Sequence, residues 1–452
     1  MFDKILIANR GEIAVRVIRA CRDMGIISVA VFSEADRQAL HTQIADEAIC
    51  IGPAPARDSY LNMQSILSAA MACGAEAIHP GYGFLSENAD FAGMCVKCGI
   101  IFIGPEAETI AMLGDKANAR ATAAAAGVPV TPGSDGIVAD INEARETAKR
   151  IGYPLMLKAS SGGGGRGIRV VNGDLELERA LNIAMGEAEA CFGSRDVYIE
   201  KYIKNPRHIE FQILADSYGD VVHLFERDCS IQRRHQKIIE ETPSPFMDDK
   251  LRAKMGGSAI NIAKATGYRN AGTVEFLVDA DRNYYFMEMN TRIQVEHPVT
   301  EQVTGLDLVK KQIEIAAGQR LGLKQENIIL KGHAMECRIN AEDPQRDFAP
   351  CPGTINGLNV PGGPGVRVDN AVYQGYTVPP FYDSMIAKLI TYSHDRATTI
   401  ARMRRALSEF LFDGVTTTVD FLLGILDDPD FVSGDYTTAF LESRGKPTER
   451  SE

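Results

Sequence analysis

The stretch EMNTRIQVE, Glu288–Glu296, alternates polar and apolar residues without interruption. In an extended chain, residues two apart point to the same face, so the pattern predicts a strand with five polar side chains in one row. Its first members could ligate a hard cation, and its last could hold an anion beside a base, as phosphoryl transfer to an oxyanion requires. Alternation alone is more typical of a surface strand with one wet face. The row consists of Glu288, Asn290, Arg292, Gln294 and Glu296.

The residues before this row predict its partner strand. A hairpin is expected, with strand, turn and return strand at Val274–Val278, Asp279–Asn283 and Tyr284–Met289. If the hairpin is centred between Asp281 and Arg282, Glu275 lies opposite Glu288. Two opposed carboxylates repel each other unless a positive charge lies between them. With the neutral oxygen of Asn290, the pair predicts an all-oxygen site for Mg²⁺ or Mn²⁺.

A glycine-rich segment joins two further predicted strands. Leu155–Ala159 carries Lys158, SSGGGGRG follows at 160–167, and Ile168–Val171 is the next strand. Contiguous glycines let backbone N–H groups enclose phosphate oxygens, and Lys158 and Arg166 add positive charge. Walker and dinucleotide-binding loops lead into a helix and have other glycine patterns. The segment therefore predicts a mobile lid over phosphates, with a flexible hairpin tip as the alternative.

A third segment concentrates basic and amide side chains. Between Glu226 and Glu241 it contains Arg227, Gln232, Arg233, Arg234, His235, Gln236 and Lys237. The chain has a formal net charge of -12 and a pI near 5.3. This charge disfavours nonspecific binding to nucleic acid, which requires a basic surface. A compact positive cluster in an acidic protein instead indicates a site for a small anion.

Strand and helix patterns predict α/β and α+β architecture. Lys4–Ala8, Glu12–Asp23 and Ser28–Phe32 read as a βαβ unit, and Ala75–Ile78 and Ile100–Ile103 extend it to a doubly wound parallel sheet. Near the end, Ile400, Met403, Leu407 and Phe410 predict an amphipathic helix that stops at Gly414. The expected domains are a Rossmann-like domain at 1–114, a helical linker at 115–129, a lid at 130–202 and a larger C-terminal domain at 203–452.

Composition agrees with a multidomain globular protein. The 452 residues are 45% hydrophobic and 24% charged, enough for two or three cores. Nine scattered cysteines, no leader and no apolar run long enough to cross a bilayer indicate a reducing cytoplasm and no membrane partner. Cys95 and Cys98 are expected to be packing thiols on a helix, because no second pair with ligand spacing follows. We interpret His41, His223 and His394 as structural or surface residues.

Six segments, taken in order, resemble the ATP-grasp superfamily and, within it, the biotin carboxylase family. They are KILIANRGEIA (Lys4–Ala14), HPGYGFLSEN (His79–Asn88), KASSGGGGRG (Lys158–Gly167), ERDCSIQRRHQK (Glu226–Lys237), EMNTRIQVEHPVTE (Glu288–Glu301) and ECRINAEDP (Glu336–Pro344). Ser161 is one departure, since many relatives have glycine there. The resemblance implies an ATP-grasp fold over essentially the whole chain.

The resemblance also implies roles for individual residues. Phosphates would be bound by Lys116, Lys158, Gly164 and Gly165, adenine by Glu200, Lys201 and the backbone near Ile203, and the rest of the nucleotide by His208, Gln232 and His235. Glu275, Glu288 and Asn290 would hold the metal. Bicarbonate would lie near Lys237, Arg292, Gln294 and the Val295 backbone, with Glu296 as the base, Arg338 facing the ureido oxygen of biotin, and Tyr82 touching biotin.

The implied reaction is ATP-dependent carboxylation of biotin with bicarbonate through carboxyphosphate, releasing ADP and phosphate. Bicarbonate is a weak nucleophile, so metal and lysines must neutralise the triphosphate while Arg292 aligns it. Carboxyphosphate hydrolyses easily, which gives a lid that excludes water a purpose. Either Glu296 or released phosphate could take the biotin proton. Without the resemblance, Arg338 could equally be an ion-pair partner of Glu336 or Asp343.

Partners follow from the same resemblance. The nearest candidate for a biotinylated lysine, Ala253–Met255, lacks the first methionine, so a separate biotin carboxyl carrier protein and carboxyltransferase subunits are expected. The family implies a homodimer with Arg16 and Arg19 near the interface. Acetyl-CoA is the acyl acceptor we expect, which would place the chain in fatty acid biosynthesis. Propionyl-CoA and pyruvate are the alternative acceptors. Another ATP-grasp ligase or a nucleotide-binding module without turnover are the alternatives.

Overall fold

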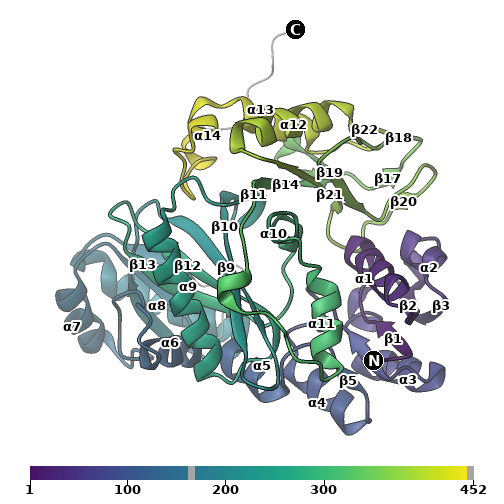
Figure 1. The fold of residues 1–452 in the computed structure, drawn as a ribbon. Helices are drawn as coiled ribbons and strands as arrows, with labels where there is room; N and C mark the ends of the chain where they lie inside the picture. The colour runs from purple at the N-terminus through teal and green to yellow at the C-terminus, as the bar shows by residue number, and fades with distance from the viewer. Residues whose placement is uncertain (161–167, 445–452) are drawn as a thin grey trace.

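The computed structural model describes residues 1–160 and 168–444 of the chain. Gly164 and Gly165 of the predicted phosphate lid, with Ser161 and Arg166, lie outside these residues. The three larger sheets can be followed in Figure 1: one near the N-terminus at the lower right, a small one beside α7 and α8 at the left, and a large one through the centre. None of the described helices is long and apolar enough to span a bilayer.

The N-terminal sheet is parallel, as predicted, and its strand order is β3-β2-β1-β4-β5. Its strands are β1 (Lys4–Ile7), β2 (Ile27–Ser33), β3 (Glu47–Gly52), β4 (Ala77–His79) and β5 (Ile101–Phe102). Its helices are α1 (Gly11–Asp23), α2 (Leu40–Ile44), α3 (Met63–Cys73) and α4 (Ala89–Lys97). After β1, Asn9 donates to the carbonyls of Pro80 and Tyr82 at 2.7 and 2.8 Å. This clip places Tyr82 at the carboxyl edge of the sheet, where ligands bind in such folds.

The small sheet is antiparallel and has the order β7-β6-β8. Its elements are β6 (Leu155–Ala159), β7 (Ile168–Val171), β8 (Val197–Lys201), α7 (Ile141–Ile151) and α8 (Asp174–Phe192). Alternation along β6 turns Leu155 and Leu157 into the core under these helices. Lys158 points to the other face, toward the cavity described below. Two helices precede this sheet, α5 (Ala107–Gly114) and α6 (Lys116–Ala125).

The large sheet has eight antiparallel strands in the order β13-β12-β9-β10-β11-β14-β21-β19. They are β9 (Arg207–Ala215), β10 (Val221–Arg233), β11 (Gln236–Thr242), β12 (Asn270–Val278), β13 (Tyr284–Asn290), β14 (His333–Asn340), β19 (Val366–Asn370) and β21 (Met385–Ser393). Its helices are α9 (Asp249–Ala265), α10 (His297–Thr304), α11 (Leu308–Ala316), α12 (Arg396–Glu409), α13 (Val419–Asp427) and α14 (Pro429–Ser433). Short strands pair outside it: β15 (Glu342–Asp343) with β16 (Ala349–Pro350), β17 (Gly353–Thr354) with β20 (Thr377–Val378), and β18 (Gly357–Asn359) with β22 (Leu411–Asp413).

The predicted hairpin exists, and Glu275 pairs directly with Glu288. Its register shifts at this pair, because Phe276 faces Phe286 and Met287 is the extra residue of a β-bulge. The prediction of one extended row through Glu296 was wrong, since β13 ends at Asn290 and turns lead into α10.

The prediction of an amphipathic helix near the C-terminus was right about its position and wrong about the residue at which it ends. Ile400, Met403 and Leu407 are buried, as expected. The helix α12 stops at Glu409 rather than Gly414, because β22 begins at Leu411 and pairs with β18. Of the two predicted packing thiols, Cys95 is buried in α4, whereas Cys98 is exposed just after it.

Candidate active site

One cavity of about 1020 Å³ lies where residues of the three sheets converge. The predicted site residues that line it are Tyr82, Lys116, Lys158, Glu200, Lys201, Ile203, His208, Gln232, His235, Lys237, Glu275, Glu288, Asn290, Arg292, Gln294, Val295 and Arg338. Glu296 is fully buried and lies directly behind Lys237 and Arg338, to which it is paired. Predicted residues as far apart in sequence as Tyr82 and Arg338 therefore share one site, although the predicted glycines lie outside the described residues.

A row of three glutamates crosses the sheet beneath the cavity. Glu210 on β9 pairs with Glu275 on β12, which pairs with Glu288 on β13. Sequence reasoning missed Glu210, although β9 carries a signal, because His208, Glu210 and Gln212 alternate with apolar residues. Three carboxylates in one row need positive charge beside them.

Lys237 supplies much of that charge. Its Nζ lies 2.5 Å from Glu210, 3.0 Å from Glu275 and 2.6 Å from Glu296. Burial would lower the pKa of Lys237, but the three carboxylates outweigh burial and raise it well above its ordinary value. Burial likewise opposes ionisation of Glu296, yet Lys237 and Arg338 hold its pKa well below the usual range. Both side chains are therefore charged at neutral pH.

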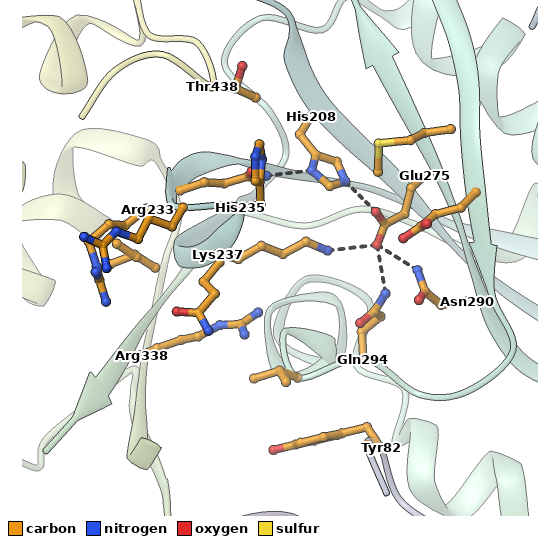
Figure 2. A pocket seen from close by; sticks show the side chains of 18 of the residues that line it. Tyr82, His208, Arg233, His235, Lys237, Glu275, Asn290, Gln294, Arg338 and Thr438 are labelled. Carbon is orange, nitrogen blue, oxygen red and sulfur yellow. Dashed lines mark hydrogen bonds and ion pairs between the residues drawn. The ribbon is translucent and has the colours of Figure 1, made fainter. Parts of the chain in front are cut away.

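Glu275 is the most heavily bonded carboxylate of the row. Its Oε1 accepts hydrogen bonds from Lys237, from Asn290 at 2.8 Å and from Gln294 at 3.0 Å, and its Oε2 lies 2.7 Å from Nε2 of His208 (Figure 2). Burial raises the pKa of Glu275, but Lys237 and His208 outweigh burial and bring it well below the ordinary value.

Glu288, by contrast, is half-buried and faces the cavity, with Lys116 at 3.5 Å. Cross-strand neighbours have Cβ atoms about 5 Å apart, a span that one ion with ligand distances of about 2.1 Å can bridge. With the amide oxygen of Asn290, the set fits a hard divalent cation. Among the described residues, His208, Glu210 and Glu275 also converge closely enough to ligate a metal. The ammonium of Lys237 already occupies that side of Glu275, which favours the face toward Glu288.

Arg292 is fixed by groups on three sides. Its Nε donates to Glu87 at 2.8 Å, Nη1 to the side-chain oxygen of Gln294 at 2.8 Å, and Nη2 to that of Asn290 at 3.2 Å. Glu87 lies in the segment between β4 and α4. The guanidinium is thus held in one orientation before any anion arrives.

Arg338 bridges two buried acids. Its Nε donates to Glu240 at 2.6 Å and its Nη2 to Glu296 at 2.9 Å, so neither Glu336 nor Asp343, the alternatives left open by sequence, is its bonded partner. Burial raises the pKa of Glu240 to about 7, against the lowering effect of Arg338.

In the region expected to bind nucleotide, two lysines interact with other groups of the protein. Lys158 forms an ion pair with Glu200, and Lys201 donates to the carbonyls of Gly152 and Tyr153 at 3.1 and 2.7 Å. Gln232 and Nδ1 of His208 are 2.7 Å apart. The hydroxyl of Tyr82 on the opposite wall donates to Glu12.

Known proteins resemble this chain over nearly its whole length. Three family models match in succession: the biotin carboxylase N-terminal domain over residues 1–110, the carbamoyl-phosphate synthase L chain ATP binding domain over 115–324, and the biotin carboxylase C-terminal domain over 336–443. The chain is 57% identical to biotin carboxylase 1 of Bacillus subtilis (strain 168), over 98% of this chain and 99% of that one.

Two solved structures share the fold. The biotin carboxylase-beta-gamma-ATP complex of Campylobacter jejuni has a TM-score of 0.95 and 50% identity, covering 98% of this chain and 99% of that one. The biotin carboxylase domain dimer of Hydrogenobacter thermophilus 2-oxoglutarate carboxylase, with MgADP, ADP and bicarbonate, has a TM-score of 0.95 and 52% identity over the whole of both chains. The chain therefore has the ATP-grasp fold and belongs to the biotin carboxylase family.

Proposed function

We propose that this cavity catalyses the ATP-dependent carboxylation of biotin with bicarbonate, through carboxyphosphate, with release of ADP and phosphate. The observation that carries the proposal is the convergence of three kinds of group in one cavity: cross-strand glutamates, an oriented arginine and a buried acid between two cations. Phosphoryl transfer needs the first two kinds, and proton transfer needs the third.

The nucleotide and metal would occupy the side of the cavity near the small sheet. Lys116 and Lys158 would contact the phosphates. Adenine would be bound by Glu200, Lys201 and the backbone of Ile203. The rest of the nucleotide would be bound by His208, Gln232 and His235. The ion pair between Lys158 and Glu200 must open for both to reach the nucleotide. Glu275, Glu288 and Asn290 would hold Mg²⁺ or Mn²⁺, which neutralises charge on the phosphates when bound. Gly164 and Gly165 would complete the phosphate contacts.

Bicarbonate would lie beside Lys237, Arg292, Gln294 and the Val295 backbone. Arg292 is held by three side-chain acceptors, so it can align the anion without a further loss of side-chain freedom. Glu296 is a weak base while Lys237 and Arg338 both bind it. A substrate anion competes for those two cations, which raises the pKa of Glu296 toward that of an effective base.

Biotin would enter between Arg338 and Tyr82. The guanidinium of Arg338 lines the cavity and carries a charge that could stabilise the ureido oxygen as the neighbouring nitrogen loses its proton. Biotin would be presented by a carrier protein, and a carboxyltransferase would pass the carboxyl group to an acyl acceptor. We keep acetyl-CoA, and with it fatty acid biosynthesis, as the proposed acceptor, although one relative belongs to a 2-oxoglutarate carboxylase.

We also propose that the chain forms a homodimer, which the relative described as a dimer supports, and that it is located in the cytoplasm. Of the two arginines expected near its interface, Arg19 is exposed, whereas Arg16 is buried and paired with Glu301 and Asp307 at 2.8 and 2.6 Å. In the proposed domains, 115–129 and 130–202 would contribute part of the nucleotide site, 1–114 would contribute Tyr82, and 203–452 would contribute the metal ligands, the bicarbonate site and the rest of the nucleotide site.

An assay with ATP, Mg²⁺, bicarbonate and free biotin tests the activity. We expect ADP release that depends on both biotin and bicarbonate. Dependence on ammonia or on a purine ribonucleotide would instead identify another ATP-grasp ligase. Nucleotide binding without hydrolysis under all these conditions would identify a binding module and refute the proposal.

A further inference from the structure

We infer that Lys388 is a positioning residue for the carboxylation site, an ammonium group behind the cavity that orients the backbone of Gln294–Glu296 and couples it to Tyr82. This inference rests on the proposed function, because it concerns the backbone assigned there to bicarbonate. Lys388 is fully buried and is not among the residues that line the cavity, so it acts through other groups.

A buried ammonium group is costly unless it is paired and hydrogen-bonded. Lys388 lies on β21, where Asp369 of β19 is its cross-strand neighbour. Both oxygens of Asp369 accept hydrogen bonds from Arg367, at 2.9 and 2.7 Å, so its charge is largely shared with that arginine. The direct ion-pair partner of Lys388 is Glu12 on α1, at 3.2 Å. Burial would lower the pKa of Lys388, but Glu12, Glu336 and Asp369 outweigh burial, and the side chain stays charged.

The other partner of this ammonium group is a backbone carbonyl of the site. Nζ of Lys388 donates to the oxygen of Val295 at 2.8 Å. One peptide earlier, the oxygen of Gln294 lies 2.8 Å from Nδ1 of His297. Burial keeps the pKa of His297 well below its ordinary value, so the neutral ring must carry its proton on Nδ1 to make this bond. Two successive carbonyls are therefore held from behind by two buried side chains.

The consequence is a fixed direction for two N–H groups. A trans peptide points its N–H opposite to its C=O, so the N–H of Val295 points away from His297 and the N–H of Glu296 away from Lys388. Because Val295 lines the cavity, its N–H is a donor set in place for an anion. The Lys388 contact also fixes the backbone from which the Glu296 carboxylate extends.

The same ammonium group fixes the opposite wall of the cavity through Glu12. Oε1 of Glu12 accepts from the hydroxyl of Tyr82, and Nζ of Lys388 lies 5.9 Å from the centre of the Tyr82 ring. Within residues 1–160 and 168–444, the buried Oε2 of Glu12 has no hydrogen-bond partner. Lys388 is thus the group that compensates Glu12, and loss of its charge loosens Tyr82 as well as Val295.

Steady-state kinetics of Lys388→Met test the inference, because methionine keeps the length of the side chain and removes the charge. We expect KM for bicarbonate to rise about tenfold and kcat to fall roughly tenfold, the size of effect that loss of a charge-assisted hydrogen bond produces. The Kd for ATP should change less than about twofold. Lys388→Arg keeps the charge and should recover part of the bicarbonate KM. An unchanged bicarbonate KM in Lys388→Met would overturn the inference.

A double variant separates positioning from charge balance. Glu12→Gln with Lys388→Met removes both buried charges, and it guards against misfolding caused by an unpaired Glu12. If Lys388 positions Val295, the double variant keeps the high bicarbonate KM. A return to the parental KM would show that Lys388 only neutralises Glu12 and would refute the inference.

Arg396→Met is the matched control. Arg396 pairs with the buried Glu241 on the same sheet, at 2.7 and 2.9 Å, and does not line the cavity. This variant should lose stability and keep the parental bicarbonate KM. The parental chain is assayed alongside, and absence of biotin-dependent ADP release there would refute the proposed function rather than the role of Lys388.

Discussion

At the scale of single residues, the charge balance of the cavity depends on Lys237. Its ammonium group contacts the carboxylates of Glu210, Glu275 and Glu296, and each carboxylate has a second partner as well. Glu210 pairs with Arg227 at 2.6 Å, and Glu296 pairs with Arg338. Breaking a buried pair on one side leaves an uncompensated charge. An incoming anion therefore competes with protein carboxylates for the same cations, which links substrate binding to the protonation of Glu296.

Arg338→Ala is expected to keep ATP binding and to lose most biotin-dependent turnover, by a factor on the order of 10², because the developing charge on biotin loses its counter-ion. ADP release with and without biotin, together with the Kd for ATP, measures both effects. Arg338→Lys keeps a positive charge beside Glu240 and Glu296 without the planar fork, so it should be intermediate. Parental turnover in Arg338→Ala would remove the role assigned to this residue.

His223 gives the fold a predictable sensitivity to acid. It is buried between Phe211 and Phe225, and burial lowers its pKa to about 4 from an ordinary value of 6.5. Between pH 6.5 and 4 the unfolded chain binds a proton that the folded chain does not, so the free energy of unfolding falls as pH drops through this window. One such group contributes at most about 1.4 kcal/mol per pH unit.

Urea unfolding of His223→Gln between pH 4 and 7 measures this contribution. The variant should show a shallower loss of stability toward acid than the parental chain, although His41 and His79, whose burial also lowers their pKa to about 4, keep part of the slope. His394→Gln is the control, because this side chain is 80% exposed. Equal slopes for His223→Gln and the parental chain would contradict the prediction.

At the scale of secondary-structure elements, the β12–β13 hairpin shows what the alternation of polar and apolar residues can predict and what it cannot. The pairing of Glu275 with Glu288 could be predicted, because both sides of the turn have strong strand patterns. The bulge at Met287 could not, since it depends on how the hairpin packs on β9. The alternation continues past the end of β13 because Arg292 and Gln294 face the same cavity from a turn. An alternation of polar and apolar residues can therefore mark side chains that face one cavity, even where the chain is not a strand.

Two adjacent glycines in α9 provide a test of packing on β10. An added Cβ at Gly256 would overlap the ring of His223, which is wedged between two phenylalanines, whereas a Cβ at Gly257 would meet nothing within 4 Å. Gly256→Ala should lower the free energy of unfolding by roughly 1–3 kcal/mol through overpacking. Gly257→Ala should raise it by about 0.5–1 kcal/mol through improved helix propensity. Chemical denaturation of both variants measures the difference, and equal effects would show that the helix does not press on His223.

At the scale of the whole molecule, residues of all three sheets share the walls of the cavity. Arg10, after β1, lies over the ring of Tyr382 at 4.2 Å, which joins the N-terminal sheet to the large one. Many of the predicted residues that line the cavity could be named from the sequence because they lie in segments that resemble a known family. Lys388 could not, since a single lysine within an apolar strand gives no sign that it is buried behind the site. Its partners Glu12 and Val295 come from distant segments that only the assembled fold brings together.

Because residues of all three sheets line the cavity, we expect a ligand bound there to stabilise the whole fold. A ligand that binds only the folded state adds about 2.7 kcal/mol at a hundred times its Kd, so ATP should raise the melting temperature of the chain. Mg²⁺ should add a further increment, because it would join the phosphates to the carboxylates of Glu275 and Glu288. In Glu288→Gln we expect the rise with ATP and EDTA to persist and the increment from Mg²⁺ to vanish.

Glu187→Gln is the matched control for this measurement, since Glu187 on α8 is also a partly exposed acid in an ion pair, with Arg169 of β7 at 2.5 Å, and neither residue lines the cavity. It should keep the full increment from Mg²⁺. Differential scanning fluorimetry with ATP plus EDTA and with ATP plus Mg²⁺ gives the two increments for each variant. An undiminished increment in Glu288→Gln would show that the cation is held elsewhere, and the cluster of His208, Glu210 and Glu275 would be the next site to test.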